Sequence, residues 1–431
     1  MSTTGRGVSR LATRTLRRHL AGPAQPWVFR RPPAGYRPPR TARTSLYVHV
    51  PFCRNACPYC PYTKVPYRAD LVPGWREAAL AEAAWWAGAT GPAEVTSIYI
   101  GGGTPTLALD AVTVVLERLR TLFAVGGEVC IETSPADVDA TLVPRLHAAG
   151  VTMVSLGVQS FAARHLRTIG RRYTPAQAEA ALDVLAAGGF AAVNADVMFA
   201  LPGQTAADVV ADLRHAAALG ADQVTTYPLF TFPYSAVGAY LHVRGVRLPD
   251  LRVRREHYRA ISAWAREDGF ERVSVWAFRR GAAPRYSSVT RDGYIGIGPG
   301  AGSHLADGFV LDTFDLDAWR AACLADRGAL ALRLPFTTEM SGWWWLYWRV
   351  YDTRIPEDGL ERMLGSDAEK ARRWLRALEA AALMRRGDDG WELTDEGAFW
   401  LHLAQNHFAL AYVDRLWTAG RREAWPAAVE L

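Results

Sequence analysis

Residues 45–62 read SLYVHVPFCRNACPYCPY, and this stretch decides the fold of the chain. It opens with apolar side chains at every second position, a period of two that predicts a β-strand. Three cysteines follow that strand within eight residues: Cys53, Cys57 and Cys60. The stretch therefore predicts a strand that leads into a loop of metal-binding thiols at one edge of a sheet.

The spacing of these cysteines, CxxxCxxC, is typical of a [4Fe-4S] cluster that leaves one iron without a protein ligand, because cysteine thiolates hold such clusters. The open iron would then bind a substrate or a cofactor. A structural zinc site is an alternative, but it needs four protein ligands, and His49 is the only nearby candidate for the fourth. A disulfide framework is disfavoured, because the chain has only Cys130 and Cys323 besides.

Length and composition indicate a protein with a full hydrophobic core. The chain has 431 residues, of which 50% are hydrophobic, enough for one large domain and one or two small ones. No apolar run is long enough to span a bilayer, so we expect a soluble protein without a membrane partner. Five cysteines, three of them in one motif, favour the reducing cytoplasm over an oxidising exterior.

The first 44 residues differ in charge from the rest of the chain. Residues 1–44 contain ten arginines and no acidic residue. Without these ten charges the net charge of +6 would become −4, so the remainder gives no indication of nucleic-acid binding. We predict that residues 1–44 form a flexible basic arm. An organellar transit peptide, which is also rich in arginine and poor in acids, is the alternative.

An alternating pattern of strands and helices follows. Strands are expected at 45–50, 97–100, 128–132, 152–156, 192–199 and 223–227. Helices are expected at 72–89, 109–123, 137–148, 162–169, 175–187 and 205–217. This alternation predicts an α/β fold with a parallel sheet and right-handed crossovers, a partial (β/α)6 TIM-like barrel. Active sites in barrels lie at the C-terminal ends of the strands, where glycines and polar residues gather in this sequence.

Beyond residue 234 the pattern becomes looser. A helix is expected at 251–268, a strand at 272–276 and a second glycine-rich loop at 294–303. A change of composition near residue 335 predicts a boundary between a barrel with its extension, 45–334, and a C-terminal module, 335–431.

The C-terminal module is rich in tryptophan, and residues 369–400 are typical of a winged-helix-like α+β unit. Such units often bind DNA, but here acidic residues balance the Lys and Arg, which favours a substrate lid or a partner surface. The alternative is that the tryptophans pack in a core or a domain interface.

Five motifs, in this order, together resemble the radical S-adenosylmethionine (SAM) enzymes related to oxygen-independent coproporphyrinogen III oxidase. They are YVHVPFCRNACPYC at 47–60, GGGTPT at 101–106, SLGVQSF at 155–161 with LRTIGR at 166–171, NADVMFALPGQT at 194–205 and GIGPGAGS at 296–303. The resemblance covers residues 46–303 and, more loosely, the C-terminal module. It implies the radical SAM barrel fold.

The resemblance also implies cofactors and the residues that hold them. Cys53, Cys57 and Cys60 would hold the cluster, whose open iron binds SAM. One electron, from a donor such as flavodoxin or ferredoxin, then cleaves SAM to methionine and a 5′-deoxyadenosyl radical. Residues matching the first SAM site are Tyr47, Tyr59, Gly102, Glu132, Ala301 and Gly302. Residues matching a second SAM site are Gly103, Thr104, Gln159, Arg171, Asp196 and Phe230.

One departure from the family pattern bears on the reaction. The coproporphyrinogen oxidases resemble CxxxCxxCxC, and Tyr62 stands here where the further cysteine would be. Three functions remain open: methyl or methylene transfer from a second SAM to an sp2 carbon of a natural product or tetrapyrrole, opening of haem, and haem chaperoning. The intact second-SAM set favours transfer to a small-molecule substrate, and CPYCPY differs from the CxYCDF form associated with the chaperones.

Overall fold

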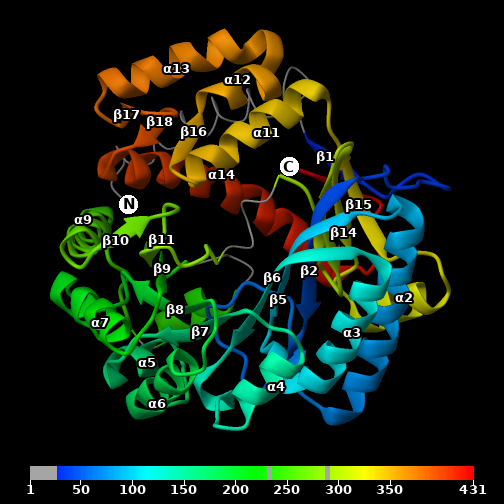
Figure 1. Cartoon of the computed structure of the whole chain (residues 1–431), viewed down its shortest axis with the longest axis horizontal. Coiled ribbons are helices and arrows are strands. Elements are labelled where there is room, and N and C mark those ends of the chain that lie inside the picture. The colour runs from blue at the N-terminus through cyan, green and yellow to red at the C-terminus, as the bar shows by residue number, and fades with distance from the viewer. Residues whose placement is uncertain (1–26, 231–234, 244, 287–291) are drawn as a thin grey trace.

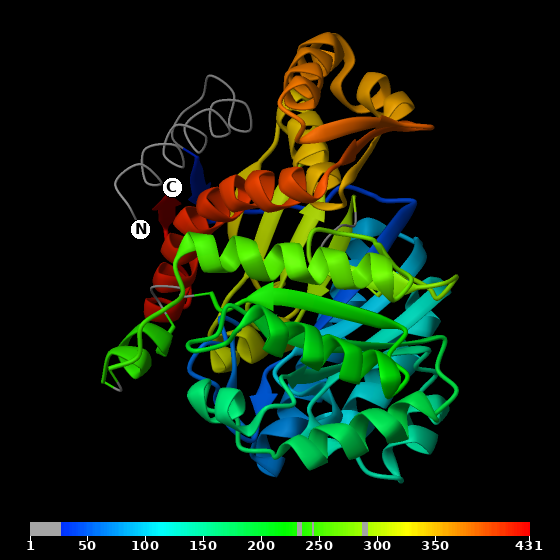
Figure 2. The same cartoon turned by 90° about the vertical axis from the view of Figure 1, so that its left-hand side faces the viewer.

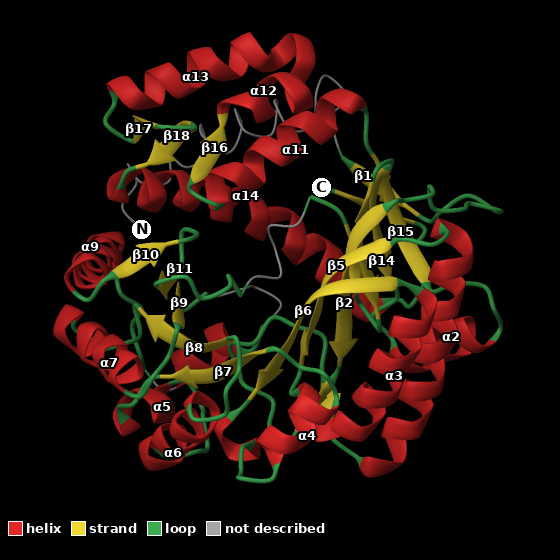
Figure 3. Cartoon of the chain, in the orientation of Figure 1, coloured by secondary structure: helices red, strands yellow, loops and turns green. Residues whose placement is uncertain are grey.

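A curved sheet organises the computed structural model, which describes residues 27–230, 235–243, 245–286 and 292–431. In these residues fourteen strands join in the order β10-β11-β9-β8-β7-β6-β5-β2-β12-β13-β14-β15-β1-β19. Helices cover the outer side of the sheet, and the strands face a central space (Figure 1; Figure 3). The architecture is α/β, as predicted.

The six predicted strands form the parallel core of this sheet. Their bounds are β2 Arg43–Val50, β5 Glu94–Gly102, β6 Ala124–Thr133, β7 Met153–Gln159, β8 Ala192–Phe199 and β9 Gln223–Pro228. Each pairs in parallel with its neighbour in the order β9-β8-β7-β6-β5-β2. The prediction of a partial barrel with six parallel strands is confirmed.

Helices connect these strands. They are α2 Val72–Thr90, α3 Leu109–Leu122, α4 Leu142–Ala148, α5 Ala163–Thr168, α6 Pro175–Ala186 and α7 Ala206–Ala218. Short 3-10 turns precede three of them, at η1 Ala69–Leu71, η2 Pro105–Ala108 and η3 Pro135–Asp137. Reciprocal capping hydrogen bonds start α6 at Thr174 and α7 at Thr205.

One helix begins later than predicted. The expected helix at 137–148 is the turn η3 followed by α4, which starts only at Leu142. The carboxylate of Asp139 accepts hydrogen bonds from the backbone N–H of Thr141, at 2.8 Å, and from its hydroxyl, at 2.6 Å. This local Asx turn competes with the helix and delays its start.

Alternate residues of the parallel strands face opposite sides. In β8, Val193, Ala195 and Val197 are at most 1% exposed and belong to the main hydrophobic core under the helices. The intervening Asp196 and Met198 face the central space, where they line a cavity. The period of two therefore gives the sheet an apolar outer face and a more polar inner face.

Further strands, most of them paired antiparallel, extend the sheet at both ends. Beside β2 they are β12 Tyr294–Ile297, which is parallel to β2, then β13 Gly302–Leu305, β14 Gly308–Asp312, β15 Leu330–Pro335, β1 Val28–Arg30 and β19 Ala428–Glu430. Beside β9 they are β11 Ala277–Arg280 and β10 Phe270–Arg272. Residues 28–30, which the prediction put in the basic arm, are thus a strand of this sheet. Residues 1–26 lie outside the described residues.

The predicted strand at 272–276 is wrong. Arg272 ends β10, and residues 273–276 form the turn of a hairpin between β10 and β11, in which the Ser274 hydroxyl accepts a hydrogen bond from the Ala277 N–H at 3.1 Å. Serine favours such a turn because its side chain can replace a backbone acceptor. Three further helices flank the extension: α8 Val237–Val243, α9 Leu251–Glu267 and α10 Leu316–Leu324.

The C-terminal residues form a small α+β unit. Its elements are α11 Thr338–Tyr351, β16 Arg354–Pro356, α12 Glu357–Leu364, η4 Gly365–Asp367, α13 Ala368–Ala380, β17 Met384–Gly387, β18 Gly390–Leu393 and α14 Asp395–Arg422. The strands pair as β16-β18-β17, an order typical of winged-helix units. Figure 2 shows α14 running from this unit back across the barrel. A division of the chain near residue 335 stays a prediction.

The tryptophans of α11 pack inside the protein. Trp343, Trp344 and Trp345 are 6–7% exposed and belong to the main hydrophobic core. Packing, the alternative in the sequence analysis, therefore describes these three side chains. Among the described residues, no helix is both long and apolar enough to cross a membrane.

Candidate active site

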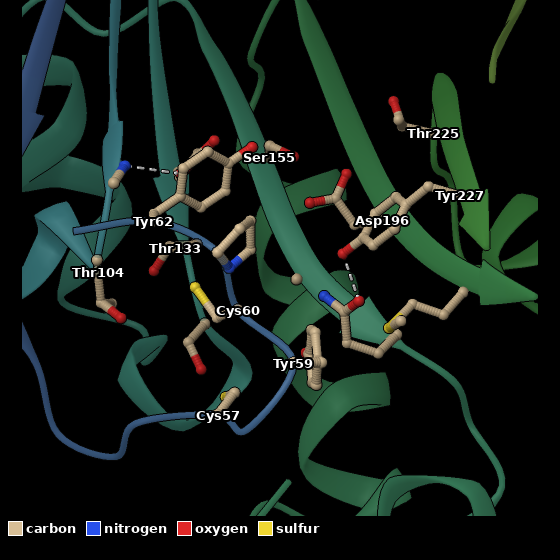
Figure 4. Close-up of a pocket in the computed structure, with 18 of the residues that line it drawn as sticks. Cys57, Tyr59, Cys60, Tyr62, Thr104, Thr133, Ser155, Asp196, Thr225 and Tyr227 are labelled. Atoms are coloured by element: carbon tan, nitrogen blue, oxygen red, sulfur yellow. Dashed lines mark hydrogen bonds between the residues drawn. The ribbon is translucent and has the colours of Figure 1, made fainter. Parts of the chain in front are cut away.

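A cavity of about 460 Å³ lies against the inner face of the sheet. Its size is in the range of small-molecule sites, about 300–1,000 Å³. The three cysteines line it together with side chains of β5 to β9. Figure 4 shows Cys57 and Cys60 around one space with Thr133, Ser155, Asp196 and Tyr227. The cavity therefore brings together the predicted cluster ligands and the ends of the parallel strands.

The cysteine loop is held from several sides. Phe52 is fully buried and begins the short strand β3 Phe52–Cys53, which pairs with β4 Val65–Pro66. Lys64 Nζ donates to the Cys60 carbonyl at 2.9 Å, and Arg421 Nη2, from α14, donates to the Pro61 carbonyl at 3.0 Å. The loop is thus fixed by its own strands and by the C-terminal helix.

The chemistry of the three thiols fits an iron-sulfur cluster. All are free of disulfides and half-buried. Burial raises the pKa of Cys53 to about 12 and also raises the pKa of Cys60, so a bound cation is needed to stabilise the thiolates. In the described residues no set of three His, Cys, Asp or Glu side chains converges on a point where a single ion would bind. This arrangement fits a cluster, because thiolates that bind different irons of a cubane surround a larger volume than the ligands of one ion.

The glycine loop after β5 packs against the cysteine loop. The Gly103 N–H donates to the Val50 carbonyl at 2.8 Å, and the Thr104 N–H donates to the Phe52 carbonyl at 2.7 Å. A Cβ atom on Gly103 would lie 2.3 Å from the Phe52 carbonyl oxygen. Glycine at position 103 therefore lets the two backbone segments approach closely.

We expect Gly103→Ala to destabilise the protein by about 3 kcal/mol, because neither backbone segment can move aside easily. Gly126→Ala is the matched control, since no atom lies within 4 Å of the added Cβ. Thermal unfolding of both variants tests this expectation. Equal unfolding temperatures for the two variants would show that the close approach at Gly103 is not limiting.

A buried carboxylate joins the glycine loop to β6. Glu132 Oε1 accepts from the Tyr99 hydroxyl at 2.5 Å, and Glu132 Oε2 accepts from the Gly102 N–H at 3.1 Å. Burial raises the pKa of Glu132 despite these two hydrogen bonds. The carboxylate lines the cavity, where it can accept a hydrogen bond from an ammonium or hydroxyl group.

The end of β7 has a strained backbone. Gln159 has φ 62° and is 1% exposed, a left-handed conformation that is unusual for a residue other than glycine. Its side-chain oxygen accepts a hydrogen bond from the Tyr227 hydroxyl at 2.6 Å, which leaves its amide N–H groups to donate. Strain of this kind is often found at functional sites, where surrounding contacts hold one conformation.

Arg171 lies between tyrosines. Its Nε donates to the Tyr59 hydroxyl at 2.7 Å, and its guanidinium lies 5.5 Å from the ring centroid of Tyr173. Because only Nε is used in this hydrogen bond, the outer nitrogens can donate to an anion in the cavity.

Asp196 faces the same cavity from β8. Its Oδ1 accepts from Asn194 Nδ2 at 2.9 Å. Burial, reinforced by the charge of Glu132, raises the pKa of Asp196 to about 7. The carboxylate and the guanidinium of Arg171 are both lining groups, so the cavity offers hydrogen-bond acceptors and a positive charge together.

The raised pKa of Asp196 predicts a pH dependence of stability. The folded protein holds this proton more tightly than the unfolded chain, so its stabilising effect is complete below the ordinary pKa of 3.8 and is lost as pH rises through about 7. Asp196→Asn should reduce the decrease in the free energy of unfolding between about pH 5 and about pH 8 by roughly 2 kcal/mol. Unfolding of the cluster-free protein between about pH 5 and about pH 8 should therefore depend less on pH in the variant. Equal pH dependence in both proteins would contradict this assignment.

Three predicted residues do not line the cavity. The Tyr47 hydroxyl is 2.8 Å from His49 Nδ1, Ala301 is 1% exposed, and Gly302 pairs with Leu311 in the sheet. The other predicted residues all line it: Cys53, Cys57, Cys60, Tyr59, Gly102, Gly103, Thr104, Glu132, Gln159, Arg171, Asp196 and Phe230. Their binding roles stay predictions.

The cavity also has lining residues that the sequence analysis missed. They include five aromatic side chains: Tyr99, Tyr227, Trp276, Tyr286 and Tyr351. Tyr99 and Tyr227 could have been predicted from the alternation of their strands. Tyr99 lies two positions from Gly101 and Tyr227 two positions from Thr225, on the same inner face of the sheet. The other three come from turns and helices outside the strand-end pattern.

Comparisons with known proteins show the family of this chain. Residues 47–216 match the radical SAM superfamily. The oxygen-independent coproporphyrinogen III oxidase of Bradyrhizobium diazoefficiens is 31% identical over 346 residues, 76% of this chain and 74% of the relative. The heme chaperone HemW of Mycobacterium tuberculosis is 32% identical over 291 residues, 64% of this chain and 74% of the relative.

A solved structure shows the same fold. Coproporphyrinogen III oxidase (HemN) from Escherichia coli matches with a TM-score of 0.72 and 21% identity, over 89% of this chain and 92% of that one. The resemblance drawn from the five sequence motifs is therefore confirmed. The chain belongs to the radical SAM superfamily, in the group that includes oxygen-independent coproporphyrinogen III oxidase and the heme chaperone, and its cofactors are a [4Fe-4S] cluster and SAM.

Proposed function

We propose that this protein transfers a methyl or methylene group from a second SAM to an sp2 carbon of a natural product or tetrapyrrole. One observation carries the proposal: every residue assigned to the second SAM lines the same cavity as the three cysteines. These residues are Gly103, Thr104, Gln159, Arg171, Asp196 and Phe230. This set gives the cavity the hydrogen-bonding groups that a second SAM needs beside the cluster.

The protein's own groups bind and orient the reactants. When bound, the cluster supplies one electron that cleaves SAM to methionine and a 5′-deoxyadenosyl radical. Arg171 offers a two-pronged hydrogen bond to a carboxylate, and Asp196 accepts hydrogen bonds from ribose hydroxyls. The tyrosines around them exclude water from the reacting groups. A small electron-transfer protein such as flavodoxin or ferredoxin would be the reductant.

Tyr62 supports transfer over decarboxylation of a porphyrinogen. It lines the mouth of the cavity and is 51% exposed, at the position where the oxidases carry a further cysteine. A tyrosine cannot replace a thiolate as an iron ligand or thiol donor with the same chemistry. We therefore infer that this chain catalyses a different reaction from the oxidases.

The products test the proposal. Anaerobically reconstituted protein, given dithionite, SAM and an acceptor with an sp2 carbon, should form 5′-deoxyadenosine, S-adenosylhomocysteine and the methylated acceptor together, measured by liquid chromatography and mass spectrometry. Formation of 5′-deoxyadenosine alone would contradict group transfer and leave simple hydrogen abstraction. With SAM labelled in its methyl group, the label should appear in the methylated product.

A haem chaperone is the second candidate. The observation that favours it is the 32% identity to heme chaperone HemW, as high as the identity to the oxidase. Stoichiometric binding of hemin to the cluster-loaded protein, with neither SAM-derived product formed, would support the chaperone and overturn the transferase.

A further inference from the structure

The short helix α8 packs against the cysteine loop. Leu241 of α8 and Tyr59 of the cysteine loop are buried in one small hydrophobic core, and Cys57 and Val246 are partly buried against the same core. Figure 2 shows α8, in green, projecting from the body of the barrel. A molecule bound at α8 would therefore lie next to the cluster site, with only Tyr59 and Cys57 between them.

The end of α5 adjoins the same place. The Tyr240 hydroxyl, from α8, donates to the Arg167 carbonyl at 3.4 Å. A Cβ atom on Gly170 would lie 3.0 Å from the side chain of Pro58 in the cysteine loop. Three stretches that are far apart in the sequence therefore meet around the thiols: residues 53–69, 161–178 and 235–249.

These three stretches are basic. They contain three, four and two Lys or Arg residues, in that order, and no Asp or Glu. The chain beyond residue 44, by contrast, has a net charge of −4. Positive charge is thus concentrated around the cysteine loop on a body that is otherwise acidic, and it would attract an anionic partner to this place.

Neighbouring acids balance only part of this charge. Three of the arginines form ion pairs: Arg54 with Asp137, Arg68 with Asp70 and Arg164 with Asp208. Arg172 and Arg247 are exposed, and neither forms an ion pair with a residue that the structure describes. The surface around the cysteine loop therefore keeps positive charge that its own acids do not neutralise.

An exposed apolar side chain lies close to Arg247. Val243, the last residue of α8, is 85% exposed, more than any other large hydrophobic side chain among the described residues. The Val246 N–H donates to the Leu241 carbonyl at 3.0 Å, so the chain turns back directly after Val243. Protein interfaces combine an apolar centre with a polar, charged rim. Neither Val243 nor Arg247 lines the cavity, so both stay accessible when the cavity is filled.

We propose that Val243, Arg247 and Arg172 form a docking surface for a small acidic electron-transfer protein that reduces the cluster. One electron passes from the reduced carrier to the cluster, and no bond forms or breaks in that step. A nucleic acid would also be attracted by the charge, but it cannot supply the electron. The assignment rests on the proposed function for the need of such a carrier, and it adds where the carrier binds and what charge it has.

Reduction and binding test this surface separately. Full-length, cluster-loaded protein is mixed anaerobically with a reduced flavodoxin of strongly negative charge, and electron paramagnetic resonance follows the reduced cluster. Calorimetry with the oxidised flavodoxin measures binding without any turnover. At low ionic strength Arg247→Glu should lower both the reduction rate and the affinity at least about fivefold, and in about 0.5 M salt less than about twofold.

Val243→Ser should weaken flavodoxin binding about threefold at low and at high salt, because salt does not screen an apolar contact. The two variants thus differ in their salt dependence. A loss that vanishes at high salt in Val243→Ser would contradict the role of Val243 as the apolar centre.

Arg373→Glu is the matched control for the change of charge. Arg373 is exposed on α13, at the opposite end of the molecule from α5 (Figure 1). This variant should keep the wild-type rate and affinity. Reduction by dithionite should agree within about twofold in all variants, which shows that each has an intact cluster. If Arg247→Glu fails to load the cluster, Arg247→Gln should show a smaller decrease with the same salt dependence.

Equal rates with flavodoxin for Arg247→Glu and Arg373→Glu would overturn the docking surface. A wild-type rate that does not depend on salt, or tighter binding of a single-stranded RNA oligonucleotide than of flavodoxin, would overturn it as well.

The docking surface and the transferase fail separately. Formation of S-adenosylhomocysteine with dithionite, together with an unchanged flavodoxin rate in Arg247→Glu, would retain the transferase and overturn the surface. The expected loss in Arg247→Glu without S-adenosylhomocysteine formation by the wild type would retain the surface and overturn the transferase.

Discussion

Cys57→Ala is expected to abolish both SAM-derived products. Three thiolates hold the cluster, and among the side chains that the structure describes no other Cys or His lines the cavity close to them to replace a lost ligand. His402 is on the far wall, together with Trp276, Tyr351 and Arg285. The variant should form no more 5′-deoxyadenosine than a protein-free control, and it should lose most of its iron and sulfide. Metal analysis and product analysis measure the two effects.

Cys323→Ala is the matched control. Cys323 is buried in α10 and does not line the cavity, so this variant should keep its iron content. If Cys57→Ala retained iron and sulfide at the wild-type level, the cysteine loop would not be the cluster site. Stoichiometric zinc in place of iron in the anaerobically purified protein would favour the alternative of a structural zinc site.

Arg171→Gln is expected to reduce S-adenosylhomocysteine formation by about a hundredfold or more. The change removes a buried positive charge that we assign to the carboxylate of the second SAM, and loss of such a charged partner commonly costs about 2–5 kcal/mol. Formation of 5′-deoxyadenosine should fall less, because the first SAM is bound by the cluster. The ratio of the two products is therefore the measurement.

Arg167→Gln serves as the control, because Arg167 lies on the exposed side of α5. Iron content must be checked in Arg171→Gln, since Arg171 also bonds to Tyr59 in the cysteine loop. An unchanged product ratio in an iron-replete Arg171→Gln variant would contradict its role at the second SAM.

The parallel core could be predicted because its signals are local. Each strand has its own apolar period, and each strand end carries its own polar or glycine residues. Gln159 and Asp196 could therefore be placed at the cavity from their positions alone. The hairpin turn at Ser274 and the Asx turn at Asp139 were missed, because one side-chain hydrogen bond overrides the local propensity there.

The far wall could not be predicted from the sequence. Arg285 and Asp352 are 67 positions apart, and Trp276 and His402 are 126 positions apart. Contacts at such separations depend on how the C-terminal unit packs against the barrel, which no local pattern specifies. For the same reason the tryptophans of α11 could be assigned to packing only once their burial was seen.

We infer that one cavity of this protein holds the cluster and two SAM molecules. Equilibrium dialysis of the cluster-loaded protein against labelled SAM, without reductant, tests it most directly because it needs no substrate. We predict two SAM molecules bound per chain in the wild type and one in Arg171→Gln. A single SAM bound per fully loaded wild-type chain would contradict the claim.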